Sequence, residues 1–178
     1  MTPSTARGCA QAALLSLALA FSPACASYRP ASASAICTGT DCYEVGPLGP
    51  EWKSVTQEDG GVGYFNATLG SVILSYASCR DDAEATPLSS LTAHLLVGYS
   101  ESHERSADLV PFAKREALRT VVDAKLDGVP VVLVLYVFKS NGCIFDLSYV
   151  ARPARYEAGL ADFGRFVEGF LQLPRPPA

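Results

Sequence analysis

Several motifs that mark common enzyme classes are missing from this chain of 178 residues. No Gly-x-Ser-x-Gly elbow presents a serine nucleophile, and no Cys-x-x-Cys pair offers the dithiol of a redox enzyme. The glycine-rich run 60–63 is not followed by Lys-Ser or Lys-Thr, so it lacks the residues of a phosphate-binding loop. The sequence therefore predicts no catalytic residues, no cofactor and no enzymatic activity.

The charge balance and the distribution of apolar residues exclude two further classes of protein. The chain has 14 basic and 18 acidic residues, with a net charge of -4. Its basic residues form no patch or stripe of the kind that binds nucleic acid. No apolar run reaches the roughly 18 residues that a transmembrane helix requires. We therefore expect neither nucleic-acid binding nor a membrane-spanning helix.

The first 26 residues have the composition of a secretory signal. Arg7 precedes a run of small and apolar residues, 9–21, and small residues dominate 22–26. Two cleavages fit this pattern. A cut after Ala26 would release a soluble secreted or periplasmic chain. A cut before Cys25 would leave that cysteine free for acylation, because the segment resembles a bacterial lipobox.

Composition divides the chain into four segments. The Ser-, Ala- and Pro-rich residues 26–35 are typical of a flexible tether, which favours lipidation at Cys25 and a membrane anchor. Ser22 stands where a lipobox usually has leucine, so both cleavages remain open. The segments are a signal peptide (1–26), a flexible tether with a small cysteine loop (27–49), one globular α+β domain (50–173) and an exposed proline-rich tail (174–178).

Four of the six cysteines remain after either cleavage, because Cys9 leaves with the signal and Cys25 is removed or lipidated. An even number of cysteines in an oxidising compartment predicts two disulfides, and four cysteines allow three pairings. One pair flanks a short loop, whereas the other two cysteines end one apolar strand and begin another. We therefore predict the disulfides Cys37–Cys42 and Cys79–Cys143.

Strand signals dominate the middle of the chain. Residues 62–67 and 71–79 read as a hairpin that is interrupted at Gly70. Three stronger strands, 117–126, 130–139 and 143–151, are separated by Asp-Gly and Asn-Gly, the residue pairs that tight hairpin turns favour. Both faces of 130–139 are apolar, which predicts a layer on each side of the sheet.

Two helices and an edge strand complete the expected architecture. A helix is predicted to begin at Thr86-Pro87, with Thr86 as N-cap, and to end at Gly98. A second helix, about 156–171, has a wide apolar stripe that should pack on the sheet. Residues 101–108 are charged and expected to be exposed, and 109–112 reads as a short edge strand. The predicted class is α+β, an antiparallel meander flanked by helices in an α/β/α sandwich.

The C-terminal half resembles a known family. It combines a Lys-Arg-Glu-Ala turn at 114–117, the sequence Leu-Asp-Gly-Val-Pro at 126–130, the paired strands and the closing Phe-Gly-Arg-Phe-Val-Glu-Gly-Phe helix at 163–170. This combination resembles the PsbP/DcrB-like proteins over about residues 50–172. The resemblance implies an antiparallel sheet flanked by helices, and an accessory or assembly role in a small secreted or lipid-anchored bacterial protein. It contains no site motif, so no functional residue is carried over.

Other candidate sites have simpler structural explanations. Zinc needs four Cys or His ligands at short spacings, but the thiols are scattered and only His94 and His103 are available. Asp81 and Asp82 lack the spacing of a calcium loop, so no metal is expected. Trp52 should pack at the edge of the core, with stacking on a ligand as the alternative.

Three functions fit these observations. The first is a non-catalytic envelope lipoprotein, facing the periplasm or the exterior, that binds an envelope protein partner or supports an assembly. The second is a carrier of a small apolar ligand between sheet and helix, using Tyr136, Phe138 or Tyr149. The third is an unrecognised hydrolase, with His94 or His103 as its base.

Overall fold

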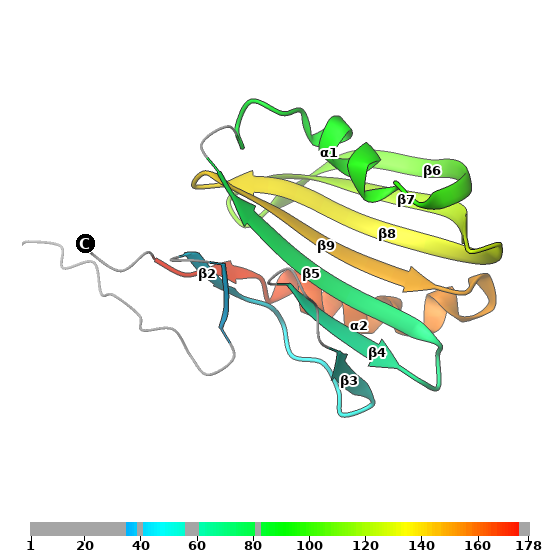
Figure 1. The fold of residues 1–178 in the computed structure, drawn as a ribbon. Helices are drawn as coiled ribbons and strands as arrows, with labels where there is room; N and C mark the ends of the chain where they lie inside the picture. The colour runs from blue at the N-terminus through cyan, green and yellow to red at the C-terminus, as the bar shows by residue number, and fades with distance from the viewer. Residues whose placement is uncertain (1–34, 39–40, 56–60, 81–82, 175–178) are drawn as a thin grey trace, which may run out of the picture.

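The computed structural model describes residues 35–38, 41–55, 61–80 and 83–174, which fold around a seven-stranded antiparallel sheet with a smaller sheet beside it (Figure 1). The large sheet has the strand order β3-β4-β5-β9-β8-β7-β6, and the small one β1-β2-β10. The strands are β1 (Ile36–Thr38), β2 (Asp41–Glu44), β3 (Trp52–Val55), β4 (Val62–Asn66), β5 (Ser71–Cys79), β6 (Tyr99–Phe112), β7 (Arg115–Leu126), β8 (Val129–Ser140), β9 (Cys143–Ala151) and β10 (Leu171–Gln172).

The predicted meander is confirmed. Strands β7, β8 and β9 pair in sequence order through two-residue turns at Asp127-Gly128 and Asn141-Gly142. All four turn residues have positive φ, which glycine adopts freely and Asp and Asn tolerate better than most residues. The predicted hairpin of β4 and β5 is also present.

Strand β6 differs from the sequence prediction. The predicted charged segment and short edge strand are one 14-residue edge strand, which pairs with β7 almost along its whole length. The register shifts between Ser100 and His103, and again between Glu104 and Ser106. The charged residues are exposed as expected, because an edge strand can point them into solvent. Pro111 lies in an edge strand, as predicted.

Helix α2 (Tyr156–Glu168) covers one face of the large sheet (Figure 1). Its buried residues Phe163, Phe166 and Val167 share a core with alternate residues of β8 and β9. The helix ends at Gly169, earlier than predicted, because the chain turns there and Leu171 pairs with β2. A 3-10 turn, η1 (Pro153–Arg155), precedes it.

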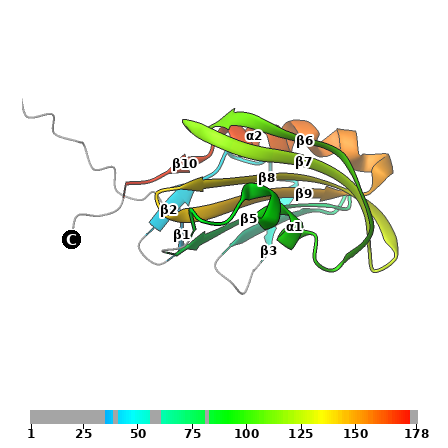
Figure 2. The same ribbon diagram turned by 90° about the horizontal axis from the view of Figure 1, so that it is seen from above.

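Helix α1 (Leu88–Leu95) lies on the opposite face, as Figure 2 shows from above. Leu95 and Leu96 pack against a second core formed by β7 and β8. The prediction of Thr86 as N-cap is wrong: Pro87 is the cap residue, its backbone is extended, and no side chain caps the helix. Within the described part of the chain, neither helix is long and apolar enough to cross a bilayer.

Strands β1 and β2, which belong to the segment assigned to the tether, pack on the domain through Ile36 and Tyr43. Tyr43 in β2 has no exposed surface, and its ring contacts Phe145 and Phe170. Ser75 donates a hydrogen bond of 2.7 Å to the Tyr43 hydroxyl. Burial raises the pKa of Tyr43 to about 12. Composition predicted a flexible tether here, but burial of the Tyr43 ring holds β2 on the core despite the turn-forming residues that follow it.

Trp52 packs at the edge of the same core, as predicted, and is 5% exposed. Its indole nitrogen donates a 2.8 Å hydrogen bond to Oδ2 of Asp162 in α2. This contact ties the edge strand β3 to the helix, so the lone tryptophan has a structural role.

Asp146 of β9 lies on the face of the sheet that carries α1. It lies opposite Tyr76 of β5 and Val137 of β8. Burial raises the pKa of Asp146 from 3.8 to about 7. Lys139 occupies the same face, but its amino group donates to the carbonyl oxygens of Glu84 and Thr86. Among the described residues, the Asp146 carboxyl forms no ion pair that would offset its burial.

The backbone at Gly46 runs directly against the end of α2. Its N–H donates a 2.9 Å hydrogen bond to the carbonyl of Phe166. A Cβ at this position would lie 1.8 Å from the carbonyl oxygen of Arg165. Only glycine allows this approach, which docks the segment after β2 on the helix.

Replacing this glycine tests the close approach. We expect Gly46→Ala to lower the free energy of unfolding by roughly 2–4 kcal/mol, because backbone atoms must move apart. Urea unfolding followed by circular dichroism measures the loss. The matched control is Gly164→Ala in α2, where an added Cβ meets nothing within 4 Å. That change should stabilise the protein by about 0.5–1 kcal/mol. Equal effects of the two changes would contradict the close backbone approach at Gly46.

Neutralising the buried carboxyl should change how stability depends on pH. The folded state binds the Asp146 proton more tightly than the unfolded state, so stability falls as pH rises from about 4 to about 7. Asp146→Asn should match the parent near pH 4 and exceed it by roughly 2–4 kcal/mol above pH 7. Urea unfolding across this range measures the difference.

A neutral substitution on the same face provides the control. Thr120 is 1% exposed, and its hydroxyl oxygen has no hydrogen-bond partner. Thr120→Val should therefore stabilise the protein by about 1 kcal/mol at every pH. If the gain from Asp146→Asn is also independent of pH, the raised pKa is not its cause.

Candidate functional site

Two hairpin turns and the small sheet meet at one end of the domain (Figure 2). Because alternate turns of an antiparallel meander lie at the same end, the β6–β7 turn at Ala113-Lys114 lies near the β8–β9 turn at Asn141-Gly142. Strand β10 lies beside both. The described chain enters at β1 and leaves after β10 at this end, so both disulfides and the polar groups near them are gathered here.

The structure contains both predicted disulfides. Cys37–Cys42 joins directly opposed residues of β1 and β2, and Cys79–Cys143 joins opposed residues of β5 and β9. Cys143 is fully buried, whereas Cys37 is exposed. One bridge therefore closes a surface hairpin, and the other fixes the register of two central strands.

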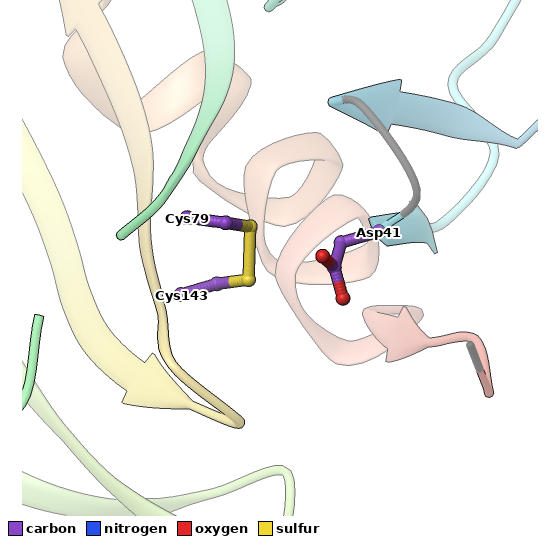
Figure 3. Close-up of side chains that lie close together, drawn as sticks. All are labelled: Asp41, Cys79 and Cys143. Atoms are coloured by element: carbon purple, nitrogen blue, oxygen red, sulfur yellow. A yellow bond between two sulfur atoms is a disulfide. The ribbon is translucent and has the colours of Figure 1, made fainter. Parts of the chain in front are cut away.

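Asp41 points toward the second disulfide, as Figure 3 shows. Its carboxylate oxygen and the sulfur atoms of Cys79 and Cys143 all lie within 4.8 Å of one another. Three such groups could hold a metal ion only if both cysteines were thiolates, but here the two sulfurs are bonded to each other.

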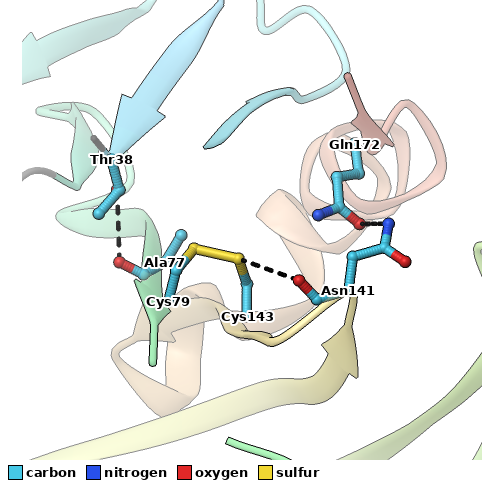
Figure 4. The surroundings of a disulfide bond; sticks show 6 residues. All are labelled: Thr38, Ala77, Cys79, Asn141, Cys143 and Gln172. Carbon is cyan, nitrogen blue, oxygen red and sulfur yellow. Dashed lines mark hydrogen bonds between the residues drawn. A yellow bond between two sulfur atoms is a disulfide. The ribbon is translucent and has the colours of Figure 1, made fainter. Parts of the chain in front are cut away.

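Hydrogen bonds fasten the small sheet around this disulfide (Figure 4). The Thr38 hydroxyl donates to the carbonyl of Ala77, and the Asn141 amide donates a 3.0 Å bond to Oε1 of Gln172. The sulfur of Cys143 lies 3.9 Å from the carbonyl oxygen of Asn141. This last approach is only a contact, because an oxidised sulfur carries no hydrogen. The β8–β9 turn is thereby held against β10.

An open pocket of about 490 Å³ lies between the β6–β7 turn, the β8–β9 turn and β10. Lys114 and Arg115 line it from one side, and the amides of Asn141 and Gln172 line it from another. Phe170, which is 8% exposed, adds an apolar wall. Cations, amide groups and one aromatic ring therefore line the same pocket.

The residues considered for an apolar ligand are divided by the structure. Phe138 and Tyr149 have no exposed surface, and neighbouring rings fill the space around them. Tyr136 instead lines an open groove of about 350 Å³ between β6 and α2, together with Phe112. Any apolar ligand would therefore lie at this edge of the domain and not inside the sheet–helix interface.

The residues considered for catalysis are not brought together. His94 lies on α1 and His103 on β6, and both are exposed. Among the described residues, no hydrogen bond joins either imidazole to a serine, cysteine or carboxylate. The residues considered for calcium, Asp81 and Asp82, lie outside the described residues, and their neighbour Glu84 is exposed. The lipidation candidate Cys25 also lies outside them.

Sequence reasoning missed the polar residues that gather at this end: Asp41, Lys114, Arg115, Asn141 and Gln172. A signal for two of them was present, since consecutive hairpins place the turns at 113–114 and 141–142 at one end of the sheet. No local sequence pattern predicts the short strand β10, which brings Gln172 to the same end of the sheet.

The fold is shared with several solved structures at low sequence identity. Neither a scan of protein-family models nor a search of curated proteins finds a match to the sequence. A protein from Bacteroides thetaiotaomicron superposes with a TM-score of 0.51 and 9% identity, over 76% of this chain and 46% of that chain. This chain thus spans about half of the Bacteroides protein.

Two further structures match most of their own length. Cyanobacterial PsbP (CyanoP) from Synechocystis has a TM-score of 0.56 and 10% identity, covering 72% of this chain and 85% of that chain. LpqN of Mycobacterium tuberculosis, described as involved in cell envelope biogenesis, has a TM-score of 0.52 and 13% identity, covering 74% and 84%. These likenesses confirm the α+β class predicted from the sequence: the chain has a PsbP-like fold.

Proposed function

We propose that this chain is a non-catalytic, exported envelope protein, anchored to a membrane through Cys25, that supports an assembly or binds a protein partner. The observation that carries the proposal is the placement of two disulfides at the end where the described chain begins. Disulfides persist in oxidising compartments, which fits the signal-like residues 1–26. The envelope role described for LpqN, which shares the fold, supports the same location.

The distribution of reactive groups supports a non-catalytic role. In the parts of the chain that the structure describes, the carboxyl with the most strongly raised pKa, Asp146, is partly buried and lies opposite Tyr76 and Val137 of the neighbouring strands. Neither histidine has a serine, cysteine or acid as hydrogen-bond partner within the same described parts. A hydrolase needs a nucleophile, a base and a group that orients the base in mutual contact. The candidates observed here are too dispersed for that chemistry.

The anchor is compatible with the geometry of the domain. Eleven steps of chain join Cys25 to Ile36, and a fully extended chain of that length spans at most about 40 Å. An acyl group on Cys25 would therefore keep the disulfide-bearing end within reach of the membrane surface.

Metabolic labelling tests the anchor directly. Cells expressing the full chain are grown with labelled palmitate, and the protein is isolated from the membrane fraction. We expect label in the parent protein and none in Cys25→Ala, which should be recovered in the soluble fraction. The control Cys9→Ala removes a cysteine within the signal and should leave labelling unchanged. An unlabelled parent protein would refute the anchor without bearing on the fold.

Stepwise reduction tests the disulfides. We expect mild reductant and an alkylating reagent to modify Cys37 and Cys42 in the folded protein, because Cys37 is exposed. Cys79 and Cys143 should react only after denaturation, since Cys143 is buried beside Asp41. Peptide mass spectrometry identifies the modified cysteines. Reaction of all four at one rate in the folded state would contradict this order.

Removing each bridge should cost different amounts of stability. The chain-entropy model gives about 2 kcal/mol for the bridge with a sequence separation of 5, and about 4 kcal/mol for the one with a separation of 64. The paired changes Cys37→Ala with Cys42→Ala, and Cys79→Ala with Cys143→Ala, compared by urea unfolding, measure both. Equal losses would show that loop length does not determine the stabilisation.

A further inference from the structure

The pocket at the β6–β7 turn concentrates positive charge in a chain whose net charge is -4. Lys114 and Arg115 are both exposed, and neither forms an ion pair with another described residue. No carboxylate is among the residues that line this pocket, whereas Glu84 and Glu116 line an adjoining hollow that shares the same two cations. Within the pocket itself, two cations that form no ion pair with a described residue, and no lining acid, favour an anion.

The turn that presents these cations is unusual. Ala113 and Lys114 both have positive φ, at 45° and 65°, whereas the two neighbouring hairpin turns place glycine at their second position. Left-handed backbone costs a non-glycine residue free energy, and such residues recur where a ligand is clamped. The chain thus has a lysine where glycine would be less strained, which is explained if the lysine side chain contacts a ligand.

Amide donors face the cations across the pocket. Asn141 donates to Oε1 of Gln172, which fixes both side chains against each other (Figure 4). The Gln172 amide nitrogen donates no hydrogen bond to the described residues, so its two N–H groups remain available. Such donors complement the oxygen atoms of a carboxylate or phosphate.

An apolar groove continues from the pocket. The groove between β6 and α2 shares Ala113 and Phe170 with the pocket, so the two cavities adjoin. Its other walls include Val110, Phe112, Tyr136 and Val167. Glu168 is the one carboxylate among the groove's lining residues, and it is exposed. The charged pocket leads into an apolar groove, and this arrangement matches a ligand with a charged head and an alkyl chain.

We propose that this pocket and groove bind an anionic single-chain amphiphile, with its carboxylate or phosphate head at Lys114 and Arg115 and its alkyl chain along Phe112, Tyr136 and Phe170. The head would exchange hydration for charge-assisted hydrogen bonds, and the chain would cover apolar surface that is otherwise open to water. The site lies within the described domain and does not depend on the anchor at Cys25.

Calorimetric titration of the exported Cys25→Ala protein, which has no acyl group of its own, tests the site. The probes are dodecyl phosphate and dodecanoate below their micellar concentrations, with butyl phosphate and inorganic phosphate for comparison. We expect both dodecyl probes to bind, and affinity to rise with chain length. Inorganic phosphate binding as tightly as dodecyl phosphate would show a simple anion site and overturn the proposal, as would no binding by either dodecyl probe.

Paired substitutions locate the head. Lys114→Gln with Arg115→Gln should weaken dodecyl phosphate binding at least about tenfold. Lys53→Gln with Arg152→Gln removes the same charge from exposed positions outside the pocket and should leave the affinity unchanged. The affinity for dodecyl maltoside, which has a neutral head, should be unchanged by either pair of substitutions. Unchanged thermal unfolding shows that each variant is folded, and equal losses in the two pairs would refute the assignment of the head.

Discussion

Burial of β8 on both faces is the constraint on which the rest of the architecture depends. Alternate residues of this strand belong to two separate cores, one beneath α2 and one beneath α1. A strand that is apolar on both sides cannot leave either side in water, so each face of the sheet must be covered. The larger core is built from aromatic rings, among which Phe138, Phe145 and Phe170 contact one another. Helix α2 is therefore fixed in position by ring packing. The end of that helix in turn sets the position of β10.

Most of this framework could be predicted from local patterns. Two-sided hydrophobicity identified β8, Asp-Gly and Asn-Gly identified its turns, and the spacing of cysteines identified both bridges. The errors arose where tertiary contacts outweigh composition. Tyr43 draws a turn-rich segment into the core, and β7 turns a charged segment into the long strand β6. The core residues that contact Tyr43, and the strand that pairs with the charged segment of β6, lie too far along the chain for one local pattern to include them.

The polar end of the domain was harder to predict for the same reason. Lys114, Asn141 and Gln172 come from three separate segments, and only the register of the meander brings the first two together. Gln172 reaches the site because Gly46 and Gly169 allow the chain to pass closely by the end of α2. Binding residues that depend on such close backbone approaches have no signature in the sequence, whereas a catalytic motif often does.

The long edge strand β6 bears on the membrane anchor proposed at Cys25. Exposed sheet edges invite pairing with another copy, and anchoring raises the local concentration of copies. Here the edge has two irregularities in register, a proline at position 111 and charged side chains of both signs. These features interrupt the row of free backbone groups that a second strand would need. The domain is thereby protected against edge-to-edge aggregation when many copies are crowded on one surface.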